Sequence, residues 1–101
     1  MAYSLQLSEA EVLHYFRTRD DLPRETRIRI FRMLHLCLGE SGDTFRNDPE
    51  LRLSPGSDCF EVNIIVGDGK ELEHLRQFRF IVSDQGAQYG VLQVLFVEEV
   101  R

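Results

Sequence analysis

The stretch Cys59–Val66, C-F-E-V-N-I-I-V, decides the fold, because apolar and polar residues alternate along most of it. One face of an extended chain here would carry Phe60, Val62, Ile64 and Val66. The other face would carry Glu61 and Asn63. This alternation predicts a strand with one buried face. Gly67-Asp68-Gly69 follows and predicts a hairpin turn, since aspartate and glycine tolerate positive φ.

Two more strands are expected beyond this turn. Gln77–Ser83 would place Phe78, Phe80 and Val82 on one face. Val91–Val97 is apolar at nearly every position, which predicts a strand at the centre of the sheet, covered on both faces. The C-terminal half is therefore expected to form a three-stranded antiparallel meander.

The N-terminal half predicts a short strand and two helices. Tyr3–Leu7 alternates like a strand, and Ser8 with Glu11 forms a capping box for a helix over residues 9–17. A second helix is expected over residues 23–38, where Gly39 would end it. Its apolar stripe would consist of Ile30, Met33, Leu34, Cys37 and Leu38.

Residues 40–58 read as a long polar connection between these halves, with Phe45, Leu51 and Leu53 holding it to the body. The predicted fold class is α+β: a short N-terminal strand, two helices, then a three-stranded antiparallel meander. Residues 1–101 are expected to form a single domain.

Composition excludes some classes of function. The chain has 101 residues, 43% of them hydrophobic, and a net charge of −5. This acidic balance argues against broad nucleic-acid binding, although six arginines lie between Arg17 and Arg32. Those arginines indicate either a basic side of the domain or a solvated helix face. No apolar run is long enough to span a membrane and no signal peptide is visible, so a cytoplasmic protein without membrane contact is expected.

Cysteine and histidine give no metal or cofactor motif. Cys37 and Cys59 are expected to be two buried thiols, and no C-x-x-C pair is present. His14, His35 and His74 do not cluster in the sequence. We therefore expect neither a metal nor a cofactor.

Arg79 is the one cation inside an aromatic strand, F-R-F-I-V at residues 78–82. Strand periodicity points its side chain away from the Phe78 and Phe80 face. An arginine held on a sheet can anchor phosphate or carboxylate. The alternative is an outer-face arginine paired with a cross-strand glutamate such as Glu61.

The order of these elements resembles the RelE/ParE toxin superfamily of bacterial toxin–antitoxin pairs. The likeness rests on the opening Y-S-L-Q-L-S-E-A, on the segment at 53–62, on Q-F-R-F-I-V at 77–82 and on the strand at 91–97. The resemblance implies a RelE/ParE-like toxin–antitoxin component, either an mRNA endonuclease or a degenerate relative. It also implies an antitoxin or target protein as partner, with RNA or the ribosome as a further one.

The resemblance gives roles to four residues. Arg79 matches the sheet arginine that contacts phosphate in the nuclease branch, and it would be catalytic. Arg52, Lys70 and Arg76 would supply further positive charge for nucleic-acid binding. Glu98 and Glu99 depart from the pattern, because carboxylates at the end of the last strand repel phosphate.

Two other functions stay open. One is a non-enzymatic protein-binding module, an immunity, inhibitor or antitoxin-type acidic protein, that binds its partner through the acidic loop or the exposed sheet. The other is a homodimer joined through a strand edge or the face of the second helix. The net charge and the Glu98-Glu99 pair favour the binding module.

Overall fold

Four strands form a single mixed sheet in the computed structural model, which describes residues 2–68 and 71–101. The strands are β1 (Ser4–Leu7), β2 (Cys59–Asp68), β3 (Glu71–Ser83) and β4 (Val91–Val100). Their order in the sheet is β1-β4-β3-β2, in which β1 runs parallel to β4 and the other pairs are antiparallel. The predicted α+β order of strand, two main helices and three antiparallel strands is confirmed.

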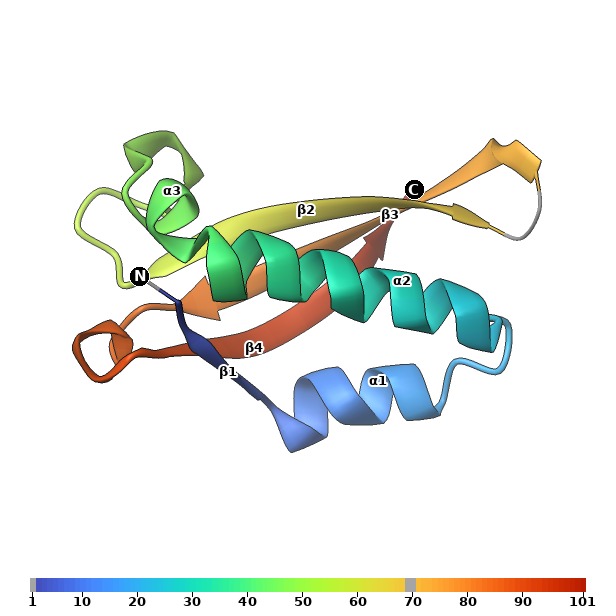
Figure 1. The fold of residues 1–101 in the computed structure, drawn as a ribbon, viewed down its shortest axis with the longest axis horizontal. Helices are drawn as coiled ribbons and strands as arrows, with labels where there is room; N and C mark the ends of the chain where they lie inside the picture. Colours follow the sequence, from blue (N-terminus) through green and yellow to red (C-terminus); the bar gives the residue numbers. More distant parts are fainter. Residues whose placement is uncertain (1, 69–70) are drawn as a thin grey trace.

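The helices follow β1 in the chain and cover one face of the sheet (Figure 1). The first is a π-helical turn, Glu9–Leu13, continued by α1 (His14–Arg17). The Ser8 hydroxyl accepts a hydrogen bond from the backbone N–H of Glu11 at 3.3 Å, as the capping box predicts. The second is α2 (Arg24–Leu34), continued by a π-helical turn, His35–Glu40.

The core lies between these helices and the sheet. Phe60, Val62, Ile64 and Val66 of β2 are buried there, as their alternation predicts. Phe78, Phe80 and Val82 of β3 are buried beside them. On α2 the buried residues Thr26, Ile30 and Leu34 recur at a spacing of four. The predicted stripe is wrong at Met33, which is 39% exposed because it lies to one side of that line.

β4 lies between β1 and β3, but it is not covered on both faces as predicted. Leu95 and Phe96 are exposed on adjacent positions. The β3–β4 register shifts between Ile81 and Val82, so Leu95 is an extra residue in β4. Such a bulge changes which positions face the core, and Val94 and Val97 are both buried. The continuous apolar run in β4 therefore reflects a bulge that shifts the inward–outward alternation of the strand. It does not reflect burial on both faces.

The long connection is more ordered than predicted. It contains α3 (Gly42–Arg46) and a 3-10 turn (Pro49–Leu51), and Phe45 and Leu51 pack on the core. Leu53 does not, since it is 47% exposed. The predicted turn at 67–69 falls partly on Gly69, which lies outside the described residues, while β2 and β3 run further toward it than predicted.

Two smaller predictions need correction. Gly39 does not end the second helix, because it lies within the last turn and has no positive φ. A Cβ at Gly39 would lie 2.9 Å from the ring of the exposed His35, which would have to turn aside. Cys37 and Cys59 are free thiols that are half-buried and not fully buried. Burial raises the pKa of the Cys37 thiol.

Candidate protein-binding surface

Arg79 lies on the sheet face opposite the helices, and carboxylates hold it on two sides. Its Nε is 3.0 Å from Glu61 and its Nη1 is 3.1 Å from Glu98. Glu98 is its direct cross-strand partner in β4. The pairing with Glu61 is the one that the alternative to a phosphate anchor predicts. A phosphate at this position would have to displace two carboxylates of the protein itself.

Arg76 lies on the helix-facing side and belongs to a cluster of four charged residues. Its Nε and Nη2 donate to the two oxygens of Glu99 at 2.8 Å each. The same Nη2 donates to Asp21 at 3.1 Å. Arg19 completes the cluster by donating to Asp21 at 2.8 Å and to Glu99 at 2.7 Å. We call these four residues the charged clasp, because they join the segment between the helices to β3 and β4.

The clasp shifts the ionisation of its acids. Hydrogen bonds from Arg76 and Arg19, opposed by burial, lower the pKa of Glu99 to about 2. Hydrogen bonds from the same two arginines hold the pKa of Asp21 well below its usual range. Both acids are therefore charged at neutral pH, and both arginines are neutralised by them. The clasp is an internal ion-pair network and offers no free cation to a ligand.

Arg52 organises the connection between the helices and β2. It donates to Asp84 at 2.6 Å, to the Ser57 carbonyl at 3.2 Å and to the Arg46 carbonyl. Its guanidinium also lies 5.3 Å from the centre of the Phe60 ring. Burial raises the pKa of Asp84, but the hydrogen bond and the charge of Arg52 oppose this effect. The net result is a pKa below the usual value. Arg52 is thus already used by the fold.

The structure does not bring the sequence-predicted site residues together. Arg79 lies on the open sheet face, Arg76 lies under the helices, and Arg52 lies beside the connection before β2. Lys70 lies outside the described residues. Each of the three described arginines contacts at least one carboxylate of the protein. Their roles in nucleic-acid binding and catalysis stay predictions.

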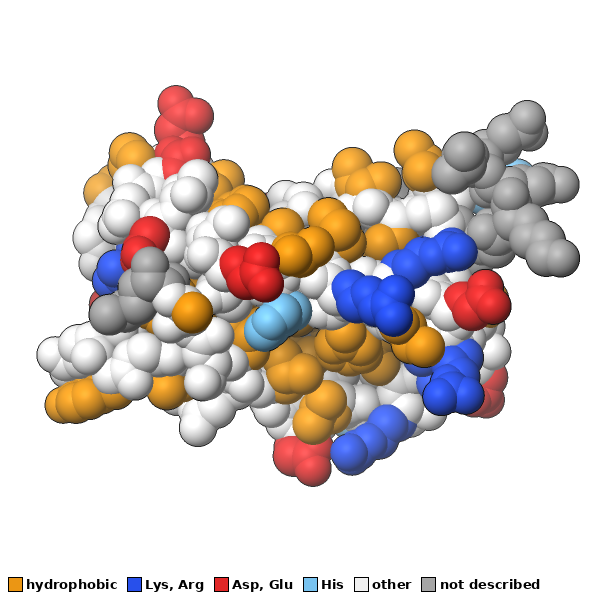
Figure 2. All heavy atoms as spheres, viewed as in Figure 1, with side chains coloured by type: hydrophobic (Ala, Val, Ile, Leu, Met, Phe, Trp, Pro, Cys, Tyr) orange, Lys and Arg blue, Asp and Glu red, His pale blue; other side chains and the backbone are white. Residues whose placement is uncertain are grey.

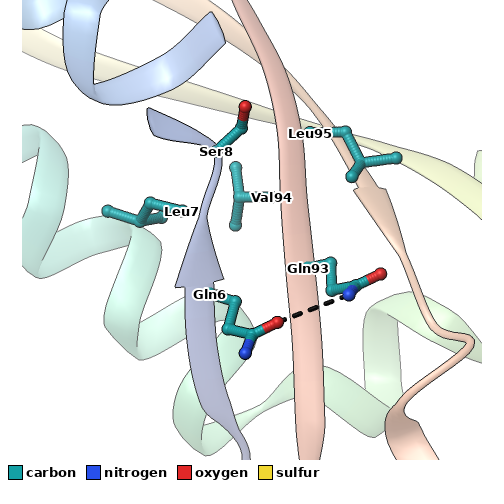
Figure 3. Close-up of a pocket in the computed structure, with 6 residues that line it drawn as sticks. All are labelled: Gln6, Leu7, Ser8, Gln93, Val94 and Leu95. Atoms are coloured by element: carbon teal, nitrogen blue, oxygen red, sulfur yellow. Dashed lines mark hydrogen bonds between the residues drawn. The ribbon is translucent and has the colours of Figure 1, made fainter. Parts of the chain in front are cut away.

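A hollow of about 320 Å³ lies where β1 pairs with β4 (Figure 3). Gln6 and Gln93 lie side by side there, joined by a hydrogen bond of 3.3 Å. Leu7, Ser8, Val94 and Leu95 line the remainder. None of these six side chains titrates near neutral pH, so the hollow holds no general acid or base.

Apolar side chains gather instead along the exposed face of the second helix (Figure 2). A groove of about 560 Å³, here called the α2 groove, is lined by Ile28, Phe31, Arg32, His35 and Leu36. These positions are spaced by three and four, so they form a second stripe beside the core stripe. Ile28 is 38% exposed and Leu36 is 48% exposed. The spacing of this second stripe is present in the sequence, but spacing alone does not tell which of two neighbouring stripes packs on the sheet.

A second groove, of about 370 Å³, runs between α2 and the edge of the sheet. This edge groove is lined by Arg29, Arg32, Met33, Leu36, Ile65, Val66 and Gly67. Met33 and Ile65 are its most exposed apolar members besides Leu36, at 39% and 55%. The two grooves share Arg32 and Leu36 and form one continuous surface, here called the α2 surface.

Arg32 differs from the arginines of the sheet. It lines both grooves and is exposed. Within the described part of the chain its side chain makes no hydrogen bond or ion pair. The guanidinium is always charged at neutral pH and presents five donors in a planar fork. An apolar surface with such a cation at its centre is suited to a partner that combines apolar and acidic groups.

Other kinds of site are absent from the described residues. No group of three histidine, cysteine or acidic side chains there could hold a metal ion. No helix among the same residues is long and apolar enough to cross a membrane.

Comparisons with known proteins assign no relative to the chain. No family model, no curated protein and no solved structure matches it. The resemblance to RelE/ParE toxins therefore stays a prediction from the sequence.

Proposed function

We propose that this protein is a non-enzymatic protein-binding module that captures an acidic segment of another protein on its α2 surface. One observation carries the proposal: three large apolar side chains, Ile28, Met33 and Leu36, are exposed around Arg32, whose side chain has no partner among the described residues. Apolar area grouped in this way is typical of interaction sites and not of an inert surface.

The distribution of charge supports the same partner. Carboxylates of the protein itself pair with Arg76, Arg79 and Arg52. The Arg32 guanidinium is available to a carboxylate of a partner. A carboxylate that reaches Arg32 while apolar groups cover Leu36 would be partly shielded from water, which strengthens the ion pair. The net charge of −5 does not oppose this, since α2 itself carries four arginines and one glutamate.

The α2 surface can be tested with two leucines of matched exposure. Leu36 is 48% exposed on this surface, and Leu53 is 47% exposed on the connection before β2. Tagged wild-type protein, Leu36→Asp and Leu53→Asp would be used to capture partners from cells that encode the chain. We expect a stoichiometric partner with wild type and Leu53→Asp and its loss with Leu36→Asp. Equal recovery by all three proteins would refute the proposal.

A second candidate function is the RelE-like toxin, favoured by the position of Arg79 on the open face of the sheet. Activity there would require Glu61 and Glu98 to release the guanidinium when RNA binds. Tightly induced expression in bacteria tests it, with wild type beside Arg79→Ala. Growth arrest by wild type alone would replace our first proposal with this one.

A further inference from the structure

β2 is an edge strand of the sheet, and other parts of the chain cover only its ends. At its start, Arg52 bridges Phe60, and the Leu53 N–H donates to the Cys59 carbonyl at 3.0 Å. At its far end, Arg29 donates to the Gly67 carbonyl at 3.4 Å, and the register shifts between Gly67 and Asp68. No described segment pairs with residues 61–66 on that side.

The direction of the free backbone groups follows from the contact at Cys59. Because its carbonyl points to the open edge, every second residue after it turns its N–H and C=O to the same side. These residues are Glu61, Asn63 and Ile65. The six residues 61–66 thus present a row of donors and acceptors about 20 Å long, at roughly 3.3 Å per residue.

This edge lacks the protection that natural sheets give to exposed strands. Its sequence E-V-N-I-I-V contains no lysine or proline and only one charge, Glu61. Ile65, which alternation places on the sheet face opposite the helices, is 55% exposed. An exposed edge of this length, without such protective residues, can pair with another strand.

The edge groove runs alongside the same residues. Ile65 and Val66 form one wall, and Met33 and Leu36 of the second helix form the other. Side chains of an added strand that point toward the helices would enter this groove, because they would continue the helix-facing side of β2. Arg32 stands at the rim, within the same lining.

We propose that the acidic segment binds as an extended fifth strand on the open edge of β2. Alternate residues of the segment would be apolar and fill the edge groove, and an aspartate or glutamate would pair with Arg32. This inference rests on the proposed function and adds the backbone pairing and the sequence pattern of the partner.

A second copy of this chain fits the edge less well. The added strand would be β2 itself, and its helix-facing side chains Val62, Ile64 and Val66 are already buried under its own helices. They could therefore not fill the groove of the other copy.

The test begins with a displayed library of random ten-residue peptides, selected on the immobilised wild-type protein. We expect the selected peptides to alternate apolar residues with aspartate or glutamate. Synthetic versions would then be methylated at one backbone nitrogen at a time. Strand addition predicts losses of about tenfold or more at every second position and little change between them, because only alternate N–H groups face β2.

Protein variants separate this inference from the proposed function. Arg32→Glu should lower the affinity for the peptides about tenfold. The control is Arg24→Glu, because Arg24 is an exposed α2 arginine outside both grooves. It should change the affinity less than about twofold. One outcome is that peptide binding is lost with Leu36→Asp but is unaffected by methylation at every position. That outcome would support the proposed function and overturn strand addition. Peptides insensitive to Leu36→Asp, or a selection without acidic alternating sequences, would overturn both.

The protein alone should sediment as a monomer at all concentrations. A concentration-dependent dimer that the selected peptides dissociate would overturn the inference in favour of a second copy on the β2 edge.

Discussion

Arg76 and Glu99 face each other across β3 and β4 through two hydrogen bonds of 2.8 Å. Their side chains are only 15% and 11% exposed. Fork-to-fork geometry of this kind is the strongest arrangement that an arginine and a carboxylate form. The residue that the family resemblance assigns to nucleic acid is thus tied to a strand end and, through Arg19 and Asp21, to the segment between the helices.

Glu99→Gln should lower the free energy of unfolding by about 2 kcal/mol, because it removes the mostly buried carboxylate that Arg19 and Arg76 share and leaves them only the more exposed Asp21. The matched control is Glu98→Gln, on the neighbouring residue, whose side chain is 48% exposed and pairs on the open face. That control should cost between about 0 and 1 kcal/mol. Urea unfolding of the three proteins measures both values, and equal costs would contradict the assigned role of the clasp.

The clasp also predicts how stability depends on pH. The pKa of Glu99 falls from 4.5 to about 2 on folding, so its contribution is complete above about pH 4.5. It is lost as the pH falls through about 2, where the folded protein takes up the proton. The difference of about 2 kcal/mol in unfolding free energy between wild type and Glu99→Gln should therefore largely disappear between pH 5 and pH 2. A difference that stays constant over this range would show that Glu99 is not ionised through the clasp.

Arg52→Lys should destabilise the protein by about 1 to 2 kcal/mol despite keeping the charge. A lysine cannot reach Asp84 and the Arg46 and Ser57 carbonyls together, and it loses the planar contact with Phe60. Arg24→Lys is the control, since the exposed Arg24 makes no described contact and the exchange should be neutral. Thermal unfolding of both variants decides whether Arg52 is used by the fold.

Arg79→Ala should leave both stability and the growth of expressing cells close to wild type. Its ion pairs with Glu61 and Glu98 are partly exposed, and such pairs contribute at most about 1 kcal/mol. A catalytic Arg79 predicts the opposite, namely growth arrest by wild type that the substitution abolishes. Growth curves after induction distinguish the two.

Much of the fold could be predicted because strand alternation and helix capping depend on residues that are close together in the sequence. Alternation along residues 59–66 gave the buried face of β2, and Ser8 with Glu11 marked the first helix. The bulge at Leu95 could not be predicted, because an extra residue in a strand leaves an apolar run unchanged while moving two residues to the surface. The parallel pairing of β1 with β4 depends on contacts far apart in the sequence, which periodicity does not report.

The candidate surface was harder to predict than the fold. Arginine content pointed to anion binding, yet ion pairs depend on which carboxylates the topology brings near, and Glu99 reaches Arg19 across 80 residues. Met33 fits a helical apolar stripe equally well whether it faces the core or the solvent. Only the packing of α2 on β2 separates the two stripes, and that packing makes the α2 surface visible.

The most direct measurement of the central claim is a calorimetric titration of the captured partner into wild type, Leu36→Asp and Leu53→Asp. A large apolar contact at the centre of an interface costs well over tenfold in affinity when it is replaced by a charge, by roughly 2 kcal/mol or more. We predict that loss for Leu36→Asp and an unchanged dissociation constant for Leu53→Asp. The same affinity for all three proteins would contradict binding through the α2 surface.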